Sequence, residues 1–287
     1  FSTQLGIISV MTTLIAFSVY RGLDEGIKTL SNVNSVLALT LVAFVFIVGP
    51  TQFIAEMSVT AVGNLIQNFF TMLTSTDALT DGDFVESWTV FYWAWWLALG
   101  PFVGMFVCKI SEGRTLRELI FGMLFWGSAG CALFFMVLGN YALDTELRGL
   151  HGVVDETLDV SPSAALASLI ERLPLGSFWL AFLAVIGIIF TATTYDSASY
   201  TLAAGASVRL APGEHPARWH RVFWAVALGV LPACLLSLGG LKALQTASVV
   251  ASLPLLFVYV IMYIAIIITL REMTETETQP VISSAGG

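Results

Sequence analysis

Residues 88–104 read WTVFYWAWWLALGPFVG, an apolar stretch inside a segment long enough to cross a membrane. Four of the eight tryptophans lie within nine positions of it, together with Phe91 and Tyr92. Packing alone does not need such a concentration of indoles. A quaternary ammonium or sulfonium ion has no N–H donor to offer and is held best by aromatic faces. The stretch therefore predicts a membrane helix that lines a site for an onium cation.

The composition of the whole chain agrees with a membrane location. Hydrophobic residues make up 57% of the 287 residues and charged residues only 11%, where a soluble domain has about 25%. The twelve Lys and Arg residues form no basic run, which argues against a nucleic-acid partner. No Cys or His spacing typical of a metal site is present. We therefore expect an integral membrane protein in contact with lipid, without a cofactor or a transition-metal site.

Apolar segments along the chain predict an all-α, multi-span helical bundle. About seven transmembrane helices are expected, at residues 5–20, 35–54, 88–108, 119–143, 177–208, 221–238 and 247–270. Residues 55–80 have apolar side chains at helical spacing, interrupted by Asn and Gln, and predict an amphipathic helix at the interface. A short helix is expected around 162–172, beginning at Ser161 or Pro162.

The distribution of Lys and Arg predicts the orientation of these spans. Alternating the spans places nine of the twelve on one side: Arg21, Lys28, Lys109, Arg114, Arg117, Arg209, Arg218, Arg221 and Arg271. That side is predicted to be cytoplasmic, which makes the interfacial helix at 55–80 extracellular. The domain organisation is then a transmembrane domain over 1–271 and a polar cytoplasmic tail over 272–287. Because the chain begins without Met and has an odd number of spans, we expect N-terminal spans to be missing.

A helical projection of the opening stretch at about 100° per residue indicates which rings converge. One stripe holds Trp88, Tyr92, Trp95 and Leu99. Phe91 and Trp96 flank this stripe, whereas Trp93 points away. An aromatic belt at the membrane interface would explain Trp88, but not a run that continues two turns into the span. The candidate substrate-binding residues are Trp95, Trp96, Trp88 and Phe91.

Gly100-Pro101 follows the aromatic run. Proline removes a helix hydrogen bond and clashes with the preceding turn, so we expect a break that frees carbonyl groups beside the aromatic face. Transporters use such discontinuous helices to bind ions and substrates. A harmless kink is the alternative.

Several segments resemble the betaine/choline/carnitine transporter (BCCT) family. They are WTVFYWAWW, PFVGMF and ISEGRTLRE between residues 88 and 118, GLDEGIKTLSNVN at 22–34, FIVGPT at 46–51 and TTYDSAS at 193–199. The resemblance extends to about Leu270 and corresponds to the C-terminal portion of the family, about spans six to twelve. It departs at Leu99, where many members carry a third tryptophan, and at Ala98, where a serine is usual.

The resemblance implies part of an inverted-repeat (LeuT-like) transporter fold in a bacterial-type inner membrane. It implies a sodium-coupled secondary transporter of compatible solutes, namely glycine betaine, choline, carnitine or dimethylsulfoniopropionate, which works by alternating access and serves osmoprotection. Trp95 and Trp96 would line the central site, and Trp88 would lie on the pathway. Many family members are trimers, which suggests a homotrimer.

The TTYDSAS segment is the candidate ion site. By the resemblance, Phe190, Thr193 and Thr194 form half of a sodium site, with Na⁺ as the coupling ion. From the residues alone, Thr hydroxyls in membrane helices more often bond to carbonyls of their own helix. Asp196, an acid inside a span, is functional by default, with three interpretations open: a proton-coupling acid, a counter-charge for an ion, or a carboxylate bonded to nearby backbone.

The sequence gives less support to other functions. No nucleophile elbow, HExxH motif or pair of intramembrane acids indicates an enzyme. A sodium-independent exchanger of onium substrates is the main alternative, and an osmosensing membrane protein is a further one.

Overall fold

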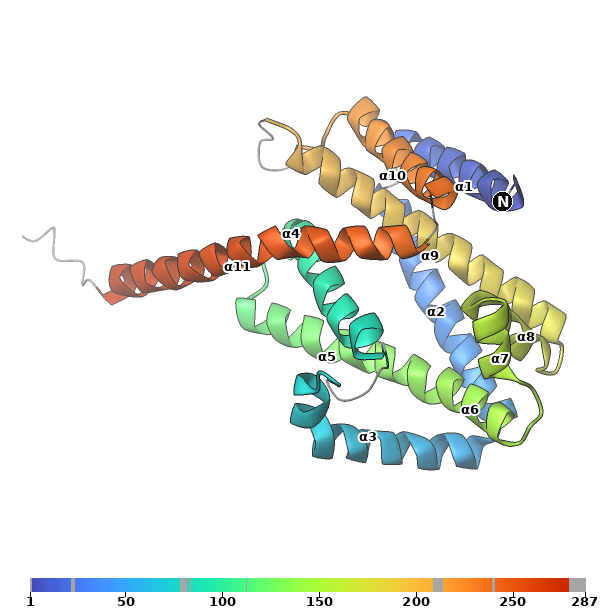
Figure 1. Cartoon of the computed structure of the whole chain (residues 1–287). Coiled ribbons are helices and arrows are strands. Elements are labelled where there is room, and N and C mark those ends of the chain that lie inside the picture. Colours follow the sequence, from blue (N-terminus) through green and yellow to red (C-terminus); the bar gives the residue numbers. More distant parts are fainter. Residues whose placement is uncertain are drawn as a thin grey trace, which may run out of the picture. The chain divides into compact units, whose positions relative to one another are not determined.

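The computed structural model describes residues 2–21, 24–77, 82, 84–111, 113–208, 214–238 and 241–278. Every regular element among these residues is a helix, as predicted. The elements are α1 (Ser2–Arg21), α2 (Asp24–Val48), α3 (Thr51–Thr74), the π-helix η1 (Val85–Val90), α4 (Phe91–Ile110), α5 (Leu116–Phe134), the π-helix η2 (Phe135–Gly139), α6 (Asn140–Leu147), α7 (Val153–Asp159), α8 (Pro162–Glu171), α9 (Gly176–Gly205), α10 (Arg218–Leu238) and α11 (Leu241–Thr278) (Figure 1).

Five stretches of the described residues are long and apolar enough to cross a membrane: Thr29–Val48, Val85–Cys108, Leu116–Leu147, Gly176–Gly205 and Gln245–Glu272. Gln4–Phe17 is a shorter apolar helix, and α10 is not among the five. The helical membrane architecture is therefore confirmed, whereas the count of seven spans stays a prediction.

The predicted span at 35–54 has the wrong limits. The helix begins earlier, at Asp24, and ends at Val48. Pro50 is the N-cap of α3 and has no N–H with which to continue α2. The Thr51 hydroxyl donates to the Phe46 carbonyl over 2.7 Å and bridges the turn. The interfacial helix predicted at 55–80 corresponds to α3, which ends at Thr74.

The helices group into two units. The first comprises Phe1–Ser75 and Met105–Ala233. Its main core joins α2, α3, η2, α8 and α9 through Val45, Ile54, Val137, Ile170 and Trp179, all buried. Phe44 of α2 stacks on Trp179 of α9 with ring centroids 3.9 Å apart. A smaller cluster packs α1 and α10 beside α9 (Figure 1).

The second unit comprises Thr76–Gly104 and Cys234–Gly287. It contains η1, most of α4, and α11. Helix α11 continues to Thr278, beyond the predicted start of the polar tail at 272. The remaining tail residues, 279–287, lie outside the described part of the chain.

Two predicted details of the loop after α6 are confirmed. Helix α8 spans Pro162–Glu171, and Ser161 is its N-cap. The Ser161 hydroxyl accepts a hydrogen bond from the Ala164 N–H over 3.1 Å, and Pro162 occupies the first turn, where its missing N–H costs nothing. The sequence around the helix start therefore encodes the cap directly.

Candidate functional site

The rings of the second unit form an aromatic ladder, which we define as Trp88, Phe91, Tyr92 and Trp95. Trp88 stacks on Tyr92 with centroids 5.8 Å apart and planes inclined by 13°. Tyr92 and Trp95 are 5.8 Å apart, and Phe91 lies 5.5 Å from Trp95. Such spacings fall in the favourable range for aromatic pairs. Three of the four predicted substrate-binding residues thus converge, with Tyr92 at the centre of the group.

Trp96, the fourth predicted residue, points elsewhere. Adjacent helical residues diverge by about 100°, and Trp96 makes no ring pair with the ladder among the interactions of the described residues. Its side chain is 65% exposed. A cation in contact with both Trp95 and Trp96 would therefore lie between the two side chains, at the side of the ladder. Trp93, predicted to be a bystander, is also exposed.

A π-helical turn leads into the ladder. Trp88 lies in η1, and the Phe91 N–H donates to the Glu86 carbonyl, five residues back. Single π-helical turns occur often at functional sites. The projection at a uniform 100° per residue does not hold over Val85–Val90, yet Trp88 still stacks on Tyr92. Glu86 supplies an exposed carboxylate in this turn.

The predicted break at Gly100-Pro101 is wrong. Helix α4 runs without interruption to Ile110, with Pro101 inside it. The Leu97 carbonyl, which would accept the hydrogen bond that Pro101 cannot donate, accepts one from the Tyr259 hydroxyl of α11 over 3.0 Å instead. The carbonyl expected to be free beside the aromatic face is thus occupied.

The predicted ion-binding residues lie on α9, in the first unit. Helix α9 is continuous across them. The Thr193 hydroxyl lies 3.0 Å from both the Ile189 and the Phe190 carbonyl oxygens, to which it can donate. This is the own-helix bonding that the sequence left open. Thr194 is exposed on the same helix, so its hydroxyl could contribute an oxygen ligand.

Asp196 has an ionic partner that the sequence did not reveal. Its carboxylate lies 3.9 Å from the Arg221 guanidinium of α10, and both side chains are almost fully buried. The guanidinium also lies 5.2 Å from the centroid of the Tyr200 ring, and the Tyr200 hydroxyl is 2.9 Å from His215 Nδ1. In the sequence, Arg221 contributes only to the distribution of Lys and Arg that predicts the orientation of the spans. The signal that could have found the pair is that an acid inside a span needs a partner.

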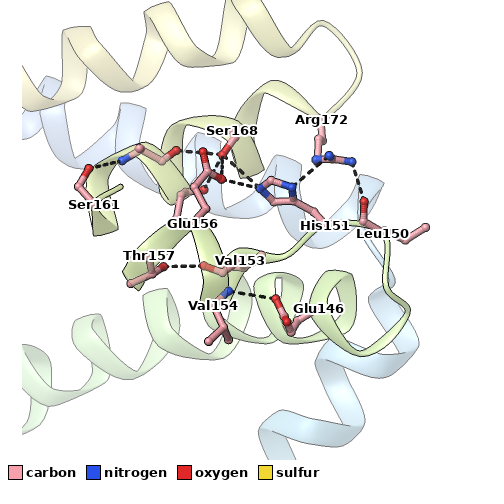
Figure 2. A network of polar contacts seen from close by, with 12 residues as sticks. Glu146, Leu150, His151, Val153, Val154, Glu156, Thr157, Ser161, Ser168 and Arg172 are labelled. Atoms are coloured by element: carbon pink, nitrogen blue, oxygen red, sulfur yellow. Dashed lines mark hydrogen bonds and ion pairs between the residues drawn. The ribbon is translucent and has the colours of Figure 1, made fainter. Parts of the chain in front are cut away.

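A second polar network joins α7 and α8 to the preceding loop (Figure 2). His151 Nε2 is 2.6 Å from a Glu156 carboxylate oxygen, which also accepts a hydrogen bond from the Ser168 hydroxyl. Arg172 donates to the Leu150 carbonyl and lies 3.1 Å from His151 Nδ1. The hydrogen bond from Ser168 is the main cause that lowers the pKa of Glu156, and His151 and Arg172 lower it further.

This network has the residue types of a hydrolytic triad but not its geometry. In a triad the serine gives its proton to a histidine whose other nitrogen is held by an acid. Here Ser168 Oγ and the Glu156 carboxylate both lie at the same nitrogen of His151, Nε2, at 3.3 and 2.6 Å. Ser168 also donates to Glu156, and the other nitrogen of His151 faces Arg172 and not an acid. The arrangement ties α7 and α8 to the preceding loop.

Comparison with known proteins identifies relatives over nearly the whole chain. The family model described as "BCCT, betaine/carnitine/choline family transporter" matches residues 1–275. The carnitine transporter of Acinetobacter baumannii is 34% identical over 91% of this chain and 48% of its own length. The high-affinity choline transport protein of Escherichia coli K12 is 33% identical over 90% of this chain and 38% of its own length.

The uncharacterized transporter YeaV of Escherichia coli K12 is 34% identical over 91% of this chain and 54% of its own length. The chain thus spans about half the length of the curated relatives that it matches. By the family match and these identities, the chain belongs to the betaine/carnitine/choline transporter family.

Proposed function

We propose that this chain is part of a secondary transporter of onium compatible solutes in a bacterial inner membrane, with its C-terminus in the cytoplasm. The observation that carries the proposal is the aromatic ladder, four rings of η1 and α4 whose neighbouring centroids lie 5.2–5.8 Å apart. The relatives named as carnitine, choline and glycine betaine transporters support the substrate class.

The binding step follows from the chemistry of the head group. A trimethylammonium group spreads its charge over methyl groups and is attracted to the negative face of an indole or phenol ring, by about 0.5–2 kcal/mol for each ring. Trp95 and Trp96 contact the cation, with Phe91 and Tyr92 beside them. Trp88, one turn before Tyr92, lies on the route to the site. Rocking of helical bundles then alternates access to the two sides.

Sodium coupling is the second element of the proposal. Na⁺ needs several oxygen ligands, and the Phe190 carbonyl and the Thr193 and Thr194 hydroxyls would contribute half of them. The Thr193 hydroxyl can give its hydrogen to the helix carbonyls at 3.0 Å and keep lone pairs for a cation. Because this same bonding also leaves α9 complete without an ion, sodium-independent exchange is the second candidate.

Uptake measurements separate the two candidates. The protein, expressed from its complete gene, is reconstituted in proteoliposomes, and uptake of labelled glycine betaine, choline, carnitine and dimethylsulfoniopropionate is measured in sodium and in potassium. Coupling predicts accumulation that depends on a sodium gradient. Equal exchange in potassium would exclude coupling and leave the exchanger.

Matched threonine variants locate the ion. Thr194→Val removes a hydroxyl from the candidate site and is expected to raise the sodium concentration needed for half-maximal uptake several-fold. Thr191→Val on the same helix is the control, because that hydroxyl donates to the Gly187 carbonyl over 2.8 Å and is outside the candidate site. Equal sodium dependence in the two variants would show that sodium does not bind at this segment.

An isostere with an uncharged head group tests whether the site recognises the positive charge of the substrate. Replacing the nitrogen of glycine betaine by carbon gives 3,3-dimethylbutanoate, which has the same shape but no cationic head. Recognition by aromatic faces predicts that it competes at least tenfold more weakly than betaine. Equal competition by 3,3-dimethylbutanoate and betaine would show that the site recognises the shape of the head group and not its charge.

A further inference from the structure

Proline inside α4 creates a defect that the helix cannot repair by itself. Pro101 has no N–H, so the hydrogen bond from residue 101 to the Leu97 carbonyl is missing. An unsatisfied carbonyl is costly in a membrane because no water can replace the donor. The rule for membrane proteins is that a neighbouring group satisfies the freed carbonyl. In this chain the donor comes from far along the sequence.

Tyr259 of α11 supplies the donor. Its hydroxyl is 3.0 Å from the Leu97 carbonyl oxygen, across 162 positions of sequence. Gly100 makes room for it: a Cβ at this position would lie 1.6 Å from the Tyr259 hydroxyl oxygen and 2.8 Å from the ring carbon that carries it. Pro101 thus leaves the Leu97 carbonyl without its helix donor, Gly100 leaves room for the tyrosine, and Tyr259 donates the hydrogen bond. We call this arrangement of Pro101, Gly100 and Tyr259 the device.

The device lies on the back of the helix relative to the aromatic ladder. At about 100° per residue, Leu97 is about 160° and Gly100 about 140° round the helix from Trp95. Tyr259 therefore contacts α4 on the face away from the ring of Trp95. It acts on the substrate site through the helix that carries the rings, which makes it a positioning residue.

We propose that Tyr259 replaces the helix hydrogen bond lost at Pro101 and so holds the ring-bearing part of α4 in line with the rest of the helix. Without the hydroxyl, α4 hinges at Pro101, and the ladder loses its fixed position. The consequence for affinity rests on the function proposed above, whereas the consequence for the helix does not. A net hydrogen bond of about 0.5–1.5 kcal/mol corresponds to a change of about two- to twelvefold.

A double-mutant cycle tests the device. Tyr259→Phe removes only the hydroxyl, and Pro101→Ala restores an N–H that can bond to the Leu97 carbonyl. Tyr259→Phe alone is expected to weaken onium binding about two- to twelvefold; in the Pro101→Ala background it is expected to change binding by less than twofold. Tyr263→Phe, one turn further along α11 on a side chain that is 67% exposed, is the matched control and should have no effect.

Hydrogen–deuterium exchange of the α4 amides around residues 97–105 provides a readout that needs no substrate. Exchange should accelerate in Tyr259→Phe and in Gly100→Ala, whose new methyl group displaces the tyrosine, but not in Tyr263→Phe. If the protein binds no onium compound but exchange follows this pattern, the proposed function fails and the device stands. Unchanged exchange in Tyr259→Phe, or an equal effect with and without Pro101, would overturn the inference.

Discussion

Breaking the buried ion pair of α9 and α10 should destabilise the first unit. Asp196 and Arg221 are each 3% exposed, with 3.9 Å between the nearest charged atoms. Coulomb's law at an effective dielectric constant of about 20 gives about 4 kcal/mol at this distance. Removal of one partner from a buried pair costs about 3–5 kcal/mol, because it leaves the other charge uncompensated. We therefore expect Asp196→Ala to lower the stability by about 3–4 kcal/mol, the contact of Arg221 with Tyr200 retaining part of the stabilisation.

The assay is thermal unfolding of the purified protein in detergent, followed by loss of the monodisperse peak in size-exclusion chromatography. About 2–4 °C are lost per kcal/mol in chains of 150–250 residues, so the apparent Tm should fall by about 10 °C. The double variant Asp196→Leu/Arg221→Met replaces both charged side chains by apolar ones. It should recover most of this loss, because apolar replacements of buried pairs are often neutral.

The same variants decide among the interpretations of Asp196. If the carboxylate serves only to pair with Arg221, the double variant is stable and transports. A stable double variant without transport would make Asp196 a coupling acid or a counter-charge. The reasoning from the pair is refuted if Asp196→Ala unfolds at the wild-type temperature, or if the double variant is no more stable than the single one.

Four further changes have defined outcomes. Leu99→Trp adds a ring to the stripe of the ladder and should tighten trimethylammonium binding about two- to thirtyfold; unchanged competition by choline would contradict this. Since the pKa of Glu156 is lowered in the folded loop, protection of residues 148–175 from proteolysis should be complete well above pH 4.3, the ordinary glutamate value, and fall as the pH drops below it. Ser168→Ala removes the main cause of the lowered pKa and should move this loss to higher pH. Gly176→Ala should fail to reach the membrane folded, because its Cβ would lie 1.9 Å from the Glu171 carbonyl oxygen; normal expression would show that the turn before α9 relaxes easily.

Features encoded locally could be predicted from the sequence. Ser161 and Pro162 marked the start of α8 because capping and the missing proline N–H act within one turn. The spacing of Trp88, Tyr92 and Trp95 predicted a common stripe. Trp88 does stack on Tyr92, and the Trp95 ring lies 5.8 Å from that of Tyr92. The apolar segment at 177–208 likewise predicted a helical span, and α9 covers Gly176–Gly205.

Features that depend on partners distant in sequence could not be predicted. Pro101 indicated a broken helix because the sequence around it contains no substitute donor, and the donor is Tyr259. Arg221 gave no sign of being the partner of Asp196, since it begins a different apolar segment. The limits of α2 differ from the predicted 35–54 because the sequence stays largely apolar up to Ile54, whereas Pro50 cannot continue the hydrogen bonds of the preceding helix.

The central claim is that the aromatic ladder binds the onium head, and equilibrium binding of labelled glycine betaine to the purified protein tests it most directly. Trp95→Ala removes a ladder ring, whereas Trp93→Ala removes an indole from the same helix outside the ladder. We predict that the Kd rises about two- to thirtyfold in Trp95→Ala, as expected for the loss of one ring–cation contact, and stays within twofold of the wild type in Trp93→Ala. Equal Kd values for the two variants would contradict the account.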